Sequence, residues 1–538
     1  MDMQNDADRR EALSRAMRQS SGSNGRRRMG AGHGHAGNVL LISLLFVIIL
    51  CGGVAIWSYI NHKTPFYVLV GDHSGHGKEK EEKREGTKNG SDGMPDQGET
   101  VQVPYEVPKT VRVLLMNSDF SSIYHDQLVL EGNTGEVTVT AVTLRENLDE
   151  ISELLSQEGV LLKQESERYV LTQKDSEQFH VLSINRACGA PAYRGSLYLY
   201  VRDDQLVLIN ELSLEEYLYS VLPSEMPASY HEEALKAQAV CARTYACAVM
   251  ENPRYPEFDA QLDDSTSCQV YGNLAEHENT TAAVEQTRGE ILLFKERPVS
   301  TYYYSTSCGI GSDISVWQGF ALEEYPYLAN RGQNAAHEEL RLSNDTEFAA
   351  YLAADHEDME SGYPWYRWSC QIADVDADTI YEKLKERYQI KQESVDDGAN
   401  PFTVPPDMLP HPGRILRLSI VERSPSGCAV CLLIEGENCS YRIYGEYNVR
   451  YLLCDGETTV IRQDGSTVVM RTILPSAYLI LTPLLDKDEV IGYSIMGGGY
   501  GHGVGMSQNG ADTLAASGVS YRDILDYYYI GIKLKIQE

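Results

Sequence analysis

The sequence has little positive charge. Of its 538 residues, 46 are Lys or Arg and 78 are Asp or Glu, which gives a formal net charge of −32 at pH 7. Because nucleic acids and anionic membrane surfaces bind basic proteins, this charge disfavours both as the main partner. A neutral polymer such as a glycan is compatible with the composition, and hydrophobic residues at 42% suffice for a sizeable core.

The cysteines reveal no disulfide framework. There are eleven, an odd number, so at least one thiol has no partner within the chain. Cys51 lies in an apolar segment, where it cannot join a disulfide outside a membrane. The other ten could pair, but their spacing does not give the connectivity, and buried free thiols are the simpler interpretation for most of them.

Charged residues are absent from one long apolar run, residues 39–60. At about 1.5 Å per residue a helix of this length crosses the roughly 30 Å of a hydrocarbon core. Seven arginines precede it, between positions 9 and 28. Since positive flanks stay inside, we expect a single-pass cell-membrane anchor with a cytoplasmic N-terminus and an extracytoplasmic C-terminal domain. A cleaved signal peptide is the alternative, but the run is long for one and no clean A-x-A site follows it.

Composition divides the chain into four parts. Residues 1–38 have no apolar period and predict a disordered, Arg-rich cytoplasmic tail, followed by the anchor at 39–60. Residues 61–104 form a charged linker. From 105 to 538, alternating and β-branched runs predominate over a few helical segments, which predicts a β-rich α+β domain. Within it, residues 333–412 have the composition of an acidic insertion.

Glu225 lies between two prolines, in Pro223-Ser224-Glu225-Met226-Pro227. Prolines fix φ and disfavour helix in the residue before them, so we expect a stiff loop. A carboxyl group held there could be partly desolvated, and desolvation raises a carboxyl pKa until the acid donates protons near neutral pH. The alternative is a solvated loop glutamate.

The segment after Glu225 predicts a helix of about twenty residues, opened by the capping pattern of Ser229 and Glu232. Lys236 and Arg243 are seven residues apart, nearly two turns, so both project from one face. Two bases on the helix behind Glu225 favour a role in a site, whereas solvated surface charges are the alternative.

Six glycines fall within nine residues at 497–505. Glycine permits positive φ and close backbone approach. No GK[ST] follows and no GxGxxG register fits, so a phosphate loop is disfavoured. A glycine-rich floor under an extended polymer fits better, with His502, Ser507 and Gln508 as polar contacts. Upstream, polar and aromatic residues surround Tyr302 and Ser305.

Two long segments resemble a known family. The stretch that contains SVLPSEMPASYHEEALKAQAVCARTYA and the stretch GGGYGHGVGMSQNGADTLAASG are similar to the SpoIID/LytB domain family. The shorter motifs STSCQVYG, YYYSTSCG, VWQGF and ILPSAYLIL follow in the family's order, and the resemblance covers roughly 105–538.

The resemblance implies a membrane-anchored peptidoglycan lytic transglycosylase. It would act during engulfment in sporulation on denuded glycan strands, which are strands already stripped of their stem peptides. Its catalytic glutamate falls on Glu225, and the basic positions of its next helix fall on Lys236 and Arg243. The expected partners are glycan strands, other cell-wall hydrolases and engulfment proteins, and no nucleic acid. For substrate binding we expect ring stacking and polar contacts from Tyr271, Tyr302, Ser305, Tyr500, His502 and Gln508.

A lytic transglycosylase can use one carboxyl group where a hydrolase normally needs two, because the sugar supplies its own nucleophile. Two alternatives stay open at this point. One is a non-enzymatic modifier or activator of a peptidoglycan amidase, and the other is a hydrolase that leaves reducing ends.

Some relatives bind zinc through a His and Cys cluster just after this helix. In this sequence Cys268 matches one such cysteine, and His277 is the nearest histidine. A tetrahedral zinc site needs about four ligands. The incomplete pattern leaves zinc as a cofactor open.

Overall fold

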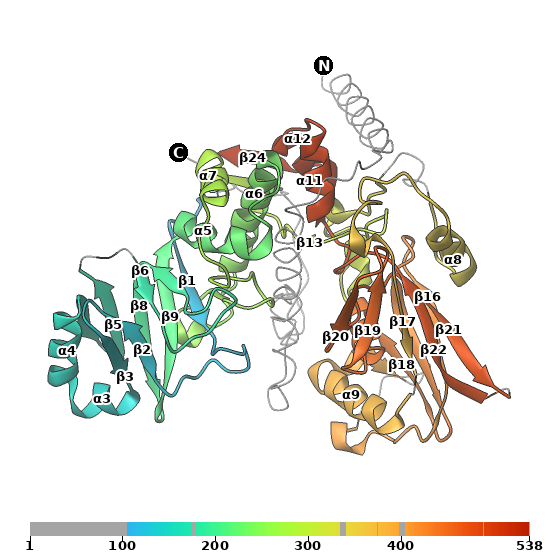
Figure 1. Ribbon diagram of the computed structural model, residues 1–538, viewed down its shortest axis with the longest axis horizontal. Helices are drawn as coiled ribbons and strands as arrows, with labels where there is room; N and C mark the ends of the chain where they lie inside the picture. The colour runs from blue at the N-terminus through green and yellow to red at the C-terminus, as the bar shows by residue number, and fades with distance from the viewer. Residues whose placement is uncertain are drawn as a thin grey trace, which may run out of the picture.

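The computed structural model describes residues 105–536, apart from 175, 177, 334–339, 374, 397–403 and 488. The expected tail, membrane anchor and linker lie outside the described residues. Within that described part, no helix is both long and apolar enough to cross a membrane. The fold is a mixture of α and β, as the sequence predicts, with two β lobes on either side of a central group of helices (Figure 1).

The first lobe is built on a six-stranded sheet. Its strand order is β10-β1-β9-β8-β5-β4, antiparallel except for the parallel pair β1 and β10. The strands are β1 (Thr110–Leu115), β4 (Val160–Glu165), β5 (Arg168–Gln173), β8 (Ser196–Arg202), β9 (Gln205–Ser213) and β10 (Leu262–Asp263). The lobe also holds β2 (Leu128–Glu131), β3 (Glu136–Val139), β6 (Gln178–His180), β7 (Ala192–Arg194), α3 (Ala141–Glu146) and α4 (Leu148–Gln157).

The central helices follow directly from β9. The pattern Ser213-Leu-Glu-Glu216 predicts a capping box at the start of a short helix. Ser213 indeed caps α5 (Leu214–Glu225) in a capping box with Glu216. The next helix, α6 (Glu232–Met250), begins after His231 and not after Ser229, because a turn from Pro227 to Tyr230 delays its start. Around α6 lie α7 (Glu278–Gln286), α11 (Gln508–Ala516), α12 (Tyr521–Tyr528) and the sheet of β12 (Arg297–Pro298), β11 (Glu290–Phe294) and β24 (Lys533–Ile536).

The second lobe contains two sheets. One has the order β20-β19-β14-β22-β21, with β14 (Trp368–Ile372), β19 (Thr458–Arg462), β20 (Thr467–Met470), β21 (Leu479–Asp486) and β22 (Glu489–Gly497). The other has the order β15-β18-β17-β16, with β15 (Val395–Asp396), β16 (Ile415–Arg423), β17 (Ala429–Gly436) and β18 (Ser440–Tyr444). Its helices are α8 (Asp345–Ala353), α9 (Ala377–Ile390) and α10 (Glu446–Leu452).

The acidic segment 333–412 does not fold apart from the chain that follows it. Its strand β14 lies between β19 and β22, at the centre of the five-stranded sheet. The burial of alternate residues in Trp368–Ile372 explains this position, since one face of the strand joins the core. The acidic composition suggested an insertion, but the segment supplies the central strand of this sheet and is therefore part of the second lobe.

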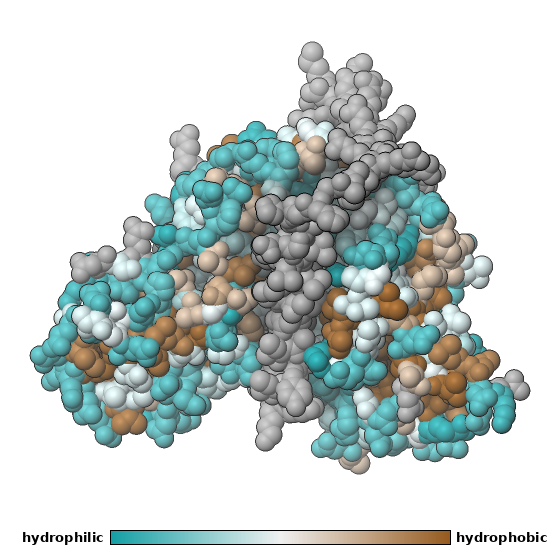
Figure 2. All heavy atoms as spheres, in the orientation of Figure 1, coloured by the Kyte–Doolittle hydropathy of each residue, from teal (hydrophilic) through white to brown (hydrophobic). Residues whose placement is uncertain are grey.

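The surface also differs between the parts of the molecule. In Figure 2 hydrophilic residues cover much of the central helices, whereas hydrophobic residues gather in patches over both lobes. Several strand residues of the second lobe are exposed and apolar, among them Ile461, Val469, Leu485 and Ile491. All ten cysteines of the described part are free thiols, and six of the ten contribute to the main core.

Arg243 lies in the core between the central helices. Its side chain is 0% exposed and forms two bonds to the Glu215 carboxylate, from Nε at 2.9 Å and Nη2 at 2.6 Å. It also donates to the backbone oxygens of Val284 and Glu290. Arg243 therefore joins α5, α6, α7 and β11. The face that it shares with Lys236 suggested a place beside Glu225, but its hydrogen bonds go to Glu215, Val284 and Glu290 instead.

Arg243→Ala is expected to lower the free energy of unfolding by about 3–5 kcal/mol, because the Glu215 carboxylate stays buried without its cation. Urea unfolding followed by circular dichroism measures this. Arg288→Ala removes an exposed pair with Glu285 and serves as the control, with a loss of about 1 kcal/mol or less. Equal losses in the two variants would contradict a structural role for Arg243.

Candidate functional site

Glu225 is the last residue of α5. The helix continues through Pro223 and ends at Met226, whose backbone is extended, as expected for a residue before Pro227. The expected stiff loop is therefore a helix end. A residue before proline disfavours the helical conformation, but tertiary packing keeps Leu222 helical and α5 continues through Pro223. Glu225 keeps the rigid placement predicted for it, now through the helix end and the proline that follows.

The Glu225 carboxyl group is largely buried and accepts two hydrogen bonds. The backbone N–H of Val270 donates to Oε1 at 2.7 Å, and the Tyr303 hydroxyl also binds the carboxyl group. Burial raises the pKa of Glu225 from its ordinary 4.5 to about 7, and the two hydrogen bonds oppose part of that rise. The group is thus a weak acid near neutral pH, which is the property that the sequence analysis predicts for it.

Tyr303 is held in the orientation that this contact needs. The Gln269 side-chain amide donates to the Tyr303 hydroxyl at 3.2 Å, and the hydroxyl of Tyr217 donates to Gln269 Oε1 at 3.3 Å. Because the Tyr303 oxygen accepts from Gln269, its own proton points to Glu225. Burial and the nearby Glu225 raise the pKa of Tyr303 well above its ordinary value, so the phenol keeps that proton.

The glycine-rich loop brings a second segment to the same place. The strand β13 (Tyr303–Tyr304) pairs in parallel with β23 (Met506–Ser507), which directly precedes α11. A Cβ on Gly505, whose φ is +79°, would overlap the carbonyl oxygen of Tyr302. Close backbone approach is therefore confirmed as the reason for glycine, and the backbone approached is that of the β13 segment.

Gln508 lies behind Glu225. Its side-chain amide donates to the backbone oxygen of Glu225 at 3.1 Å and approaches Gln238 Oε1 at 3.5 Å. Gln238 lies on α6 and is 0% exposed, and its own amide nitrogen has no hydrogen-bond partner among the described residues. Gln508 thus supports the end of α5. Because Gln508 is buried, at 8% exposure, its side chain can hold Glu225 in position but is poorly placed to bind a substrate.

His502 packs among aromatic rings. Its ring centroid lies 5.1 Å from that of Trp317, 5.8 Å from Tyr304 and 6.3 Å from Tyr302. Its Nδ1 accepts the N–H of Val504 at 3.1 Å. Burial lowers the pKa of His502 to about 4, so the ring is neutral at physiological pH and is not a proton donor there.

The other predicted site residues divide into two groups. Tyr302, Ser305 and Tyr500 are partly exposed on or beside the β13 segment, where a substrate could reach them. Tyr271 is instead fully buried, with its hydroxyl bonded to Asn210 and its ring against Tyr193 and Tyr217. A buried ring cannot stack on a sugar.

Lys236 lies on α6, and its contacts are local. Its Nζ lies 2.8 Å from the carboxylate of Glu232 and 2.8 Å from that of Glu233. It also lies 6.0 Å from the centroid of the Tyr521 ring. None of these groups is Glu225. Neither base of α6 therefore contacts the Glu225 carboxyl group.

The residues that resemble a zinc site do not fit the metal. The Cys268 sulfur accepts from the Arg254 guanidinium at 3.0 Å, and burial raises the pKa of this thiol to about 12, so it is protonated beside a cation. His277 caps α7, accepting the N–H of Asn279. In the part of the chain that the structure describes, no group of three or more His, Cys, Asp and Glu side chains could hold a metal ion.

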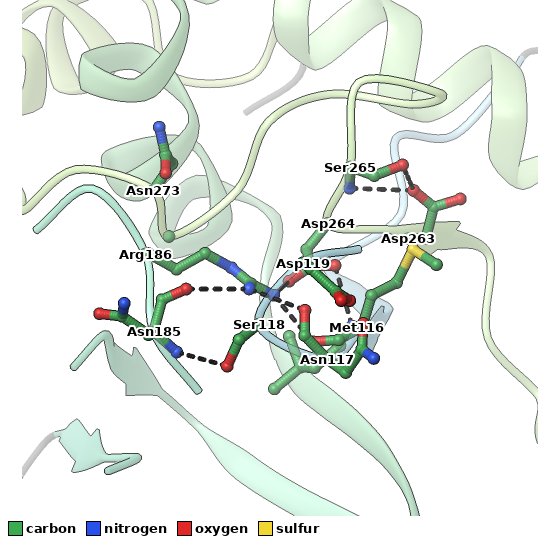
Figure 3. A network of polar contacts seen from close by, with 12 residues as sticks. Met116, Asn117, Ser118, Asp119, Asn185, Arg186, Asp263, Asp264, Ser265 and Asn273 are labelled. Atoms are coloured by element: carbon green, nitrogen blue, oxygen red, sulfur yellow. Dashed lines mark hydrogen bonds and ion pairs between the residues drawn. The ribbon is translucent and has the colours of Figure 1, made fainter. Parts of the chain in front are cut away.

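A buried ion pair anchors the loop that carries Gln269 and Val270 (Figure 3). Arg186 donates to Asp264 at 2.6 Å, and both side chains are 0% exposed. Asp264 also accepts the N–H of Met116, and Arg186 donates to the backbone oxygens of Met116 and Asn117. The start of the loop is thereby fixed to the end of β1, and sequence patterns gave no signal for this pair.

Two stretches of this chain match known protein families. Residues 202–294, which include Glu225, Gln269 and Val270, match the SpoIID family, described as "Stage II sporulation protein". The chain carries a SpoIID-family domain. Residues 314–505 match a second family, described as "Domain of unknown function (DUF8618)". Tyr303 lies between the two matched ranges, and Gln508 lies beyond the second.

Several relatives align with more than half of this chain. The Amidase enhancer of Bacillus subtilis (strain 168) is 28% identical over 59% of this chain, which spans 40% of that protein's length. Stage II sporulation protein D of the same organism is 25% identical over 61% of this chain and 75% of its own length. An uncharacterized protein of Brachyspira hyodysenteriae is 28% identical over 64% of this chain and 72% of its own length.

The raised pKa of Glu225 predicts a stability difference that depends on pH. Since the carboxyl pKa is higher in the folded state than in the unfolded state, the stability contributed by its proton is present below pH 4.5 and is lost as the pH rises through 7. Glutamine does not titrate and stays neutral at every pH. The gain in thermal midpoint of Glu225→Gln over wild type should therefore be larger at pH 8 than at pH 5.

Glu232→Gln is the matched control, because Lys236 lowers the pKa of the exposed Glu232. Its glutamine variant should show no gain in thermal midpoint at pH 8. Scanning calorimetry at the two pH values gives the comparison, and a Glu225→Gln effect that is the same at both would refute the raised pKa.

Proposed function

We propose that this protein is a lytic transglycosylase of peptidoglycan in which Glu225 is the single acid and base. The observation that carries the proposal is the buried Glu225 carboxyl group, whose pKa is raised to about 7. Its contacts among the described residues are the Val270 N–H and the Tyr303 hydroxyl, and they include no second carboxylate.

In the first step, Glu225 gives its proton to the glycosidic oxygen between MurNAc and GlcNAc as the bond to C1 breaks. Positive charge then develops at C1 and negative charge on the Glu225 carboxylate. The Val270 N–H and the Tyr303 hydroxyl both donate to that carboxyl group, so they stabilise the charged form as it appears.

In the second step, the Glu225 carboxylate takes the proton of the MurNAc C6 hydroxyl while that oxygen attacks C1. Glu225 is thereby protonated again, and the product carries a 1,6-anhydro end. No water is consumed. The partly exposed Tyr302, Ser305 and Tyr500 are proposed to contact the sugars, while Gln269 and Gln508 position the groups around Glu225.

The cellular setting belongs to the same proposal. Relatives named Stage II sporulation protein D support a role in sporulation, in which denuded glycan strands are the substrate. The apolar run at 39–60 would anchor the protein in the cell membrane, with its N-terminus cytoplasmic and its catalytic domain outside. Other cell-wall hydrolases and engulfment proteins are the proposed protein partners.

The name of one relative favours a second candidate function. A protein called Amidase enhancer is 28% identical to this chain. On that basis the chain would bind glycan or an amidase without cleaving the polymer, and Glu225 would be structural. The two functions differ in whether the purified protein alone changes the glycan.

Purified full-length protein incubated with denuded glycan strands should release products with 1,6-anhydro ends, detected by mass spectrometry. Glu225→Ala and Glu225→Gln should each lower the rate by about 10²–10⁴-fold, because the only proton donor is lost. Glu232→Gln, at the first residue of α6, should keep the wild-type rate.

Each other outcome has a distinct meaning. An unchanged polymer with wild-type protein would contradict the enzyme, and faster release of stem peptides from intact peptidoglycan by an added amidase would then support the enhancer. Reducing ends in place of anhydro ends would identify a hydrolase. Full activity of the Glu225 variants would remove Glu225 from the mechanism.

A further inference from the structure

A short segment of the second lobe, residues 358–367, lies against the elements that hold Glu225. Within it, Glu360 is 0% exposed. Its Oε2 accepts the N–H of Ser307 at 2.8 Å, and its carboxyl group also binds the Ser507 hydroxyl. Gln333 contacts it twice, donating to Oε1 and accepting the N–H of Glu360 at 3.2 Å.

These partners occupy particular places in the fold. Ser307 follows β13, the strand that carries Tyr303, and Ser507 is both the end of β23 and the N-cap of α11. The first residue of α11 is Gln508, which binds the backbone oxygen of Glu225. One side chain therefore binds two of the three segments that place a hydrogen-bonding group beside Glu225, the third being the loop that carries Val270.

Neighbouring residues of the segment strengthen the same connection. The backbone oxygen of Trp365 accepts the N–H of Gly499 at 2.8 Å, and the Trp365 ring lies 4.7 Å from that of Tyr500. The hydroxyl of Tyr363 donates to Asp512 on α11, and the other oxygen of Asp512 accepts the N–H of His231, just before α6. The segment thus contacts the glycine-rich loop, α11 and, through Asp512, the start of α6.

The packing around Glu360 leaves no space. A Cβ on Gly510 would lie 2.9 Å from Glu360 Oε1 and would overlap the Tyr528 hydroxyl. Burial raises the pKa of Glu360 to about 8, so the group is mostly neutral at pH 7, and no Lys or Arg is among its hydrogen-bond partners. A neutral, hydrogen-bonded acid fixes geometry without the need for a counter-charge.

We propose that Glu360 is a positioning residue for Glu225, and that the domain at 314–505 serves to hold β13 and the start of α11 at the separation that the Glu225 site needs. Glu360 touches neither Glu225 nor the reacting sugar, and acts through Ser307 and Ser507. The proposal rests on the proposed function of Glu225 and assigns to the second domain a role in that site.

Two measurements on the purified full-length protein test it. The first is amide hydrogen exchange, in which Glu360→Ala should accelerate exchange at least tenfold at 303–309 and 506–511 and leave β8 and β9 of the first lobe unchanged. The second is glycan cleavage, in which Glu360→Ala should lower kcat about tenfold or more with less than a threefold change in KM. Glu360→Gln keeps one acceptor oxygen, so both effects should be smaller than those of Glu360→Ala.

Leu384→Ala is the control for general destabilisation, because Leu384 is 0% exposed in α9 of the same lobe and makes none of these contacts. It should lower the thermal midpoint without accelerating exchange at 303–309. If Glu360→Ala leaves exchange there unchanged, or if Leu384→Ala accelerates it equally, Glu360 has no positioning role.

Two further arms keep the result decisive. If Glu360→Ala does not fold, Gln333→Ala takes its place, because it removes one hydrogen-bond partner of Glu360. It should accelerate exchange at 303–309 and 506–511, but less than Glu360→Ala would. If Gln333→Ala does not accelerate exchange there, the proposal is overturned. If wild-type protein makes no anhydro ends, the proposed function fails, while the exchange measurement still decides whether Glu360 holds these segments.

Discussion

The burial of one carboxyl group at the end of α5 is the constraint on which the site depends. A solvated glutamate would be ionised at neutral pH and could not donate a proton. Burial raises the pKa of Glu225 to about 7, while the Val270 N–H and the Tyr303 hydroxyl keep the ionised form accessible. The opposed effects leave the group close to the midpoint of its titration, where one residue can act first as an acid and then as a base.

This balance requires parts of the chain that are far apart in sequence. Val270 and Gln269 lie on a loop anchored by the Arg186–Asp264 pair of the first lobe. Tyr303 lies on β13, and Gln508 begins α11 directly after β23, which pairs in parallel with β13. The second lobe reaches both segments through Glu360. The central helices carry Glu225 itself, held by the buried pair of Arg243 and Glu215. Both lobes therefore contribute to the surroundings of a single acid.

Sequence patterns predicted the parts of this arrangement that are local. The prolines around Glu225 indicated a rigid acid, the capping box at Ser213 indicated the start of α5, and the glycines at 497–505 indicated close backbone approach. Burial is a property of the whole fold, and here prediction failed. Arg243 and Tyr271 have residue types common in sites, yet both lie in the core.

The same reason explains what the sequence did not reveal. Tyr303 stands in a run of three tyrosines that nothing local distinguishes, and only pairing with β23 selects it. Glu360 lies in an acidic stretch whose composition indicates solvent exposure, yet it is fully buried. Gln269 lies in the motif STSCQVYG, but its residue type alone did not single it out. Lys236, Tyr302, Ser305 and Tyr500 are still predictions as site residues.

The pH dependence of kcat/KM for release of 1,6-anhydro ends tests the account most directly. If protonated Glu225 is the acid, the rate constant is flat at low pH and falls tenfold per pH unit above a single ionisation near pH 7. Phenylalanine at position 303 removes a hydrogen bond that favours the carboxylate, so Tyr303→Phe should move that ionisation to higher pH. A fall that begins near pH 4.5, or a profile that Tyr303→Phe does not move, would contradict a buried Glu225 as the catalytic acid.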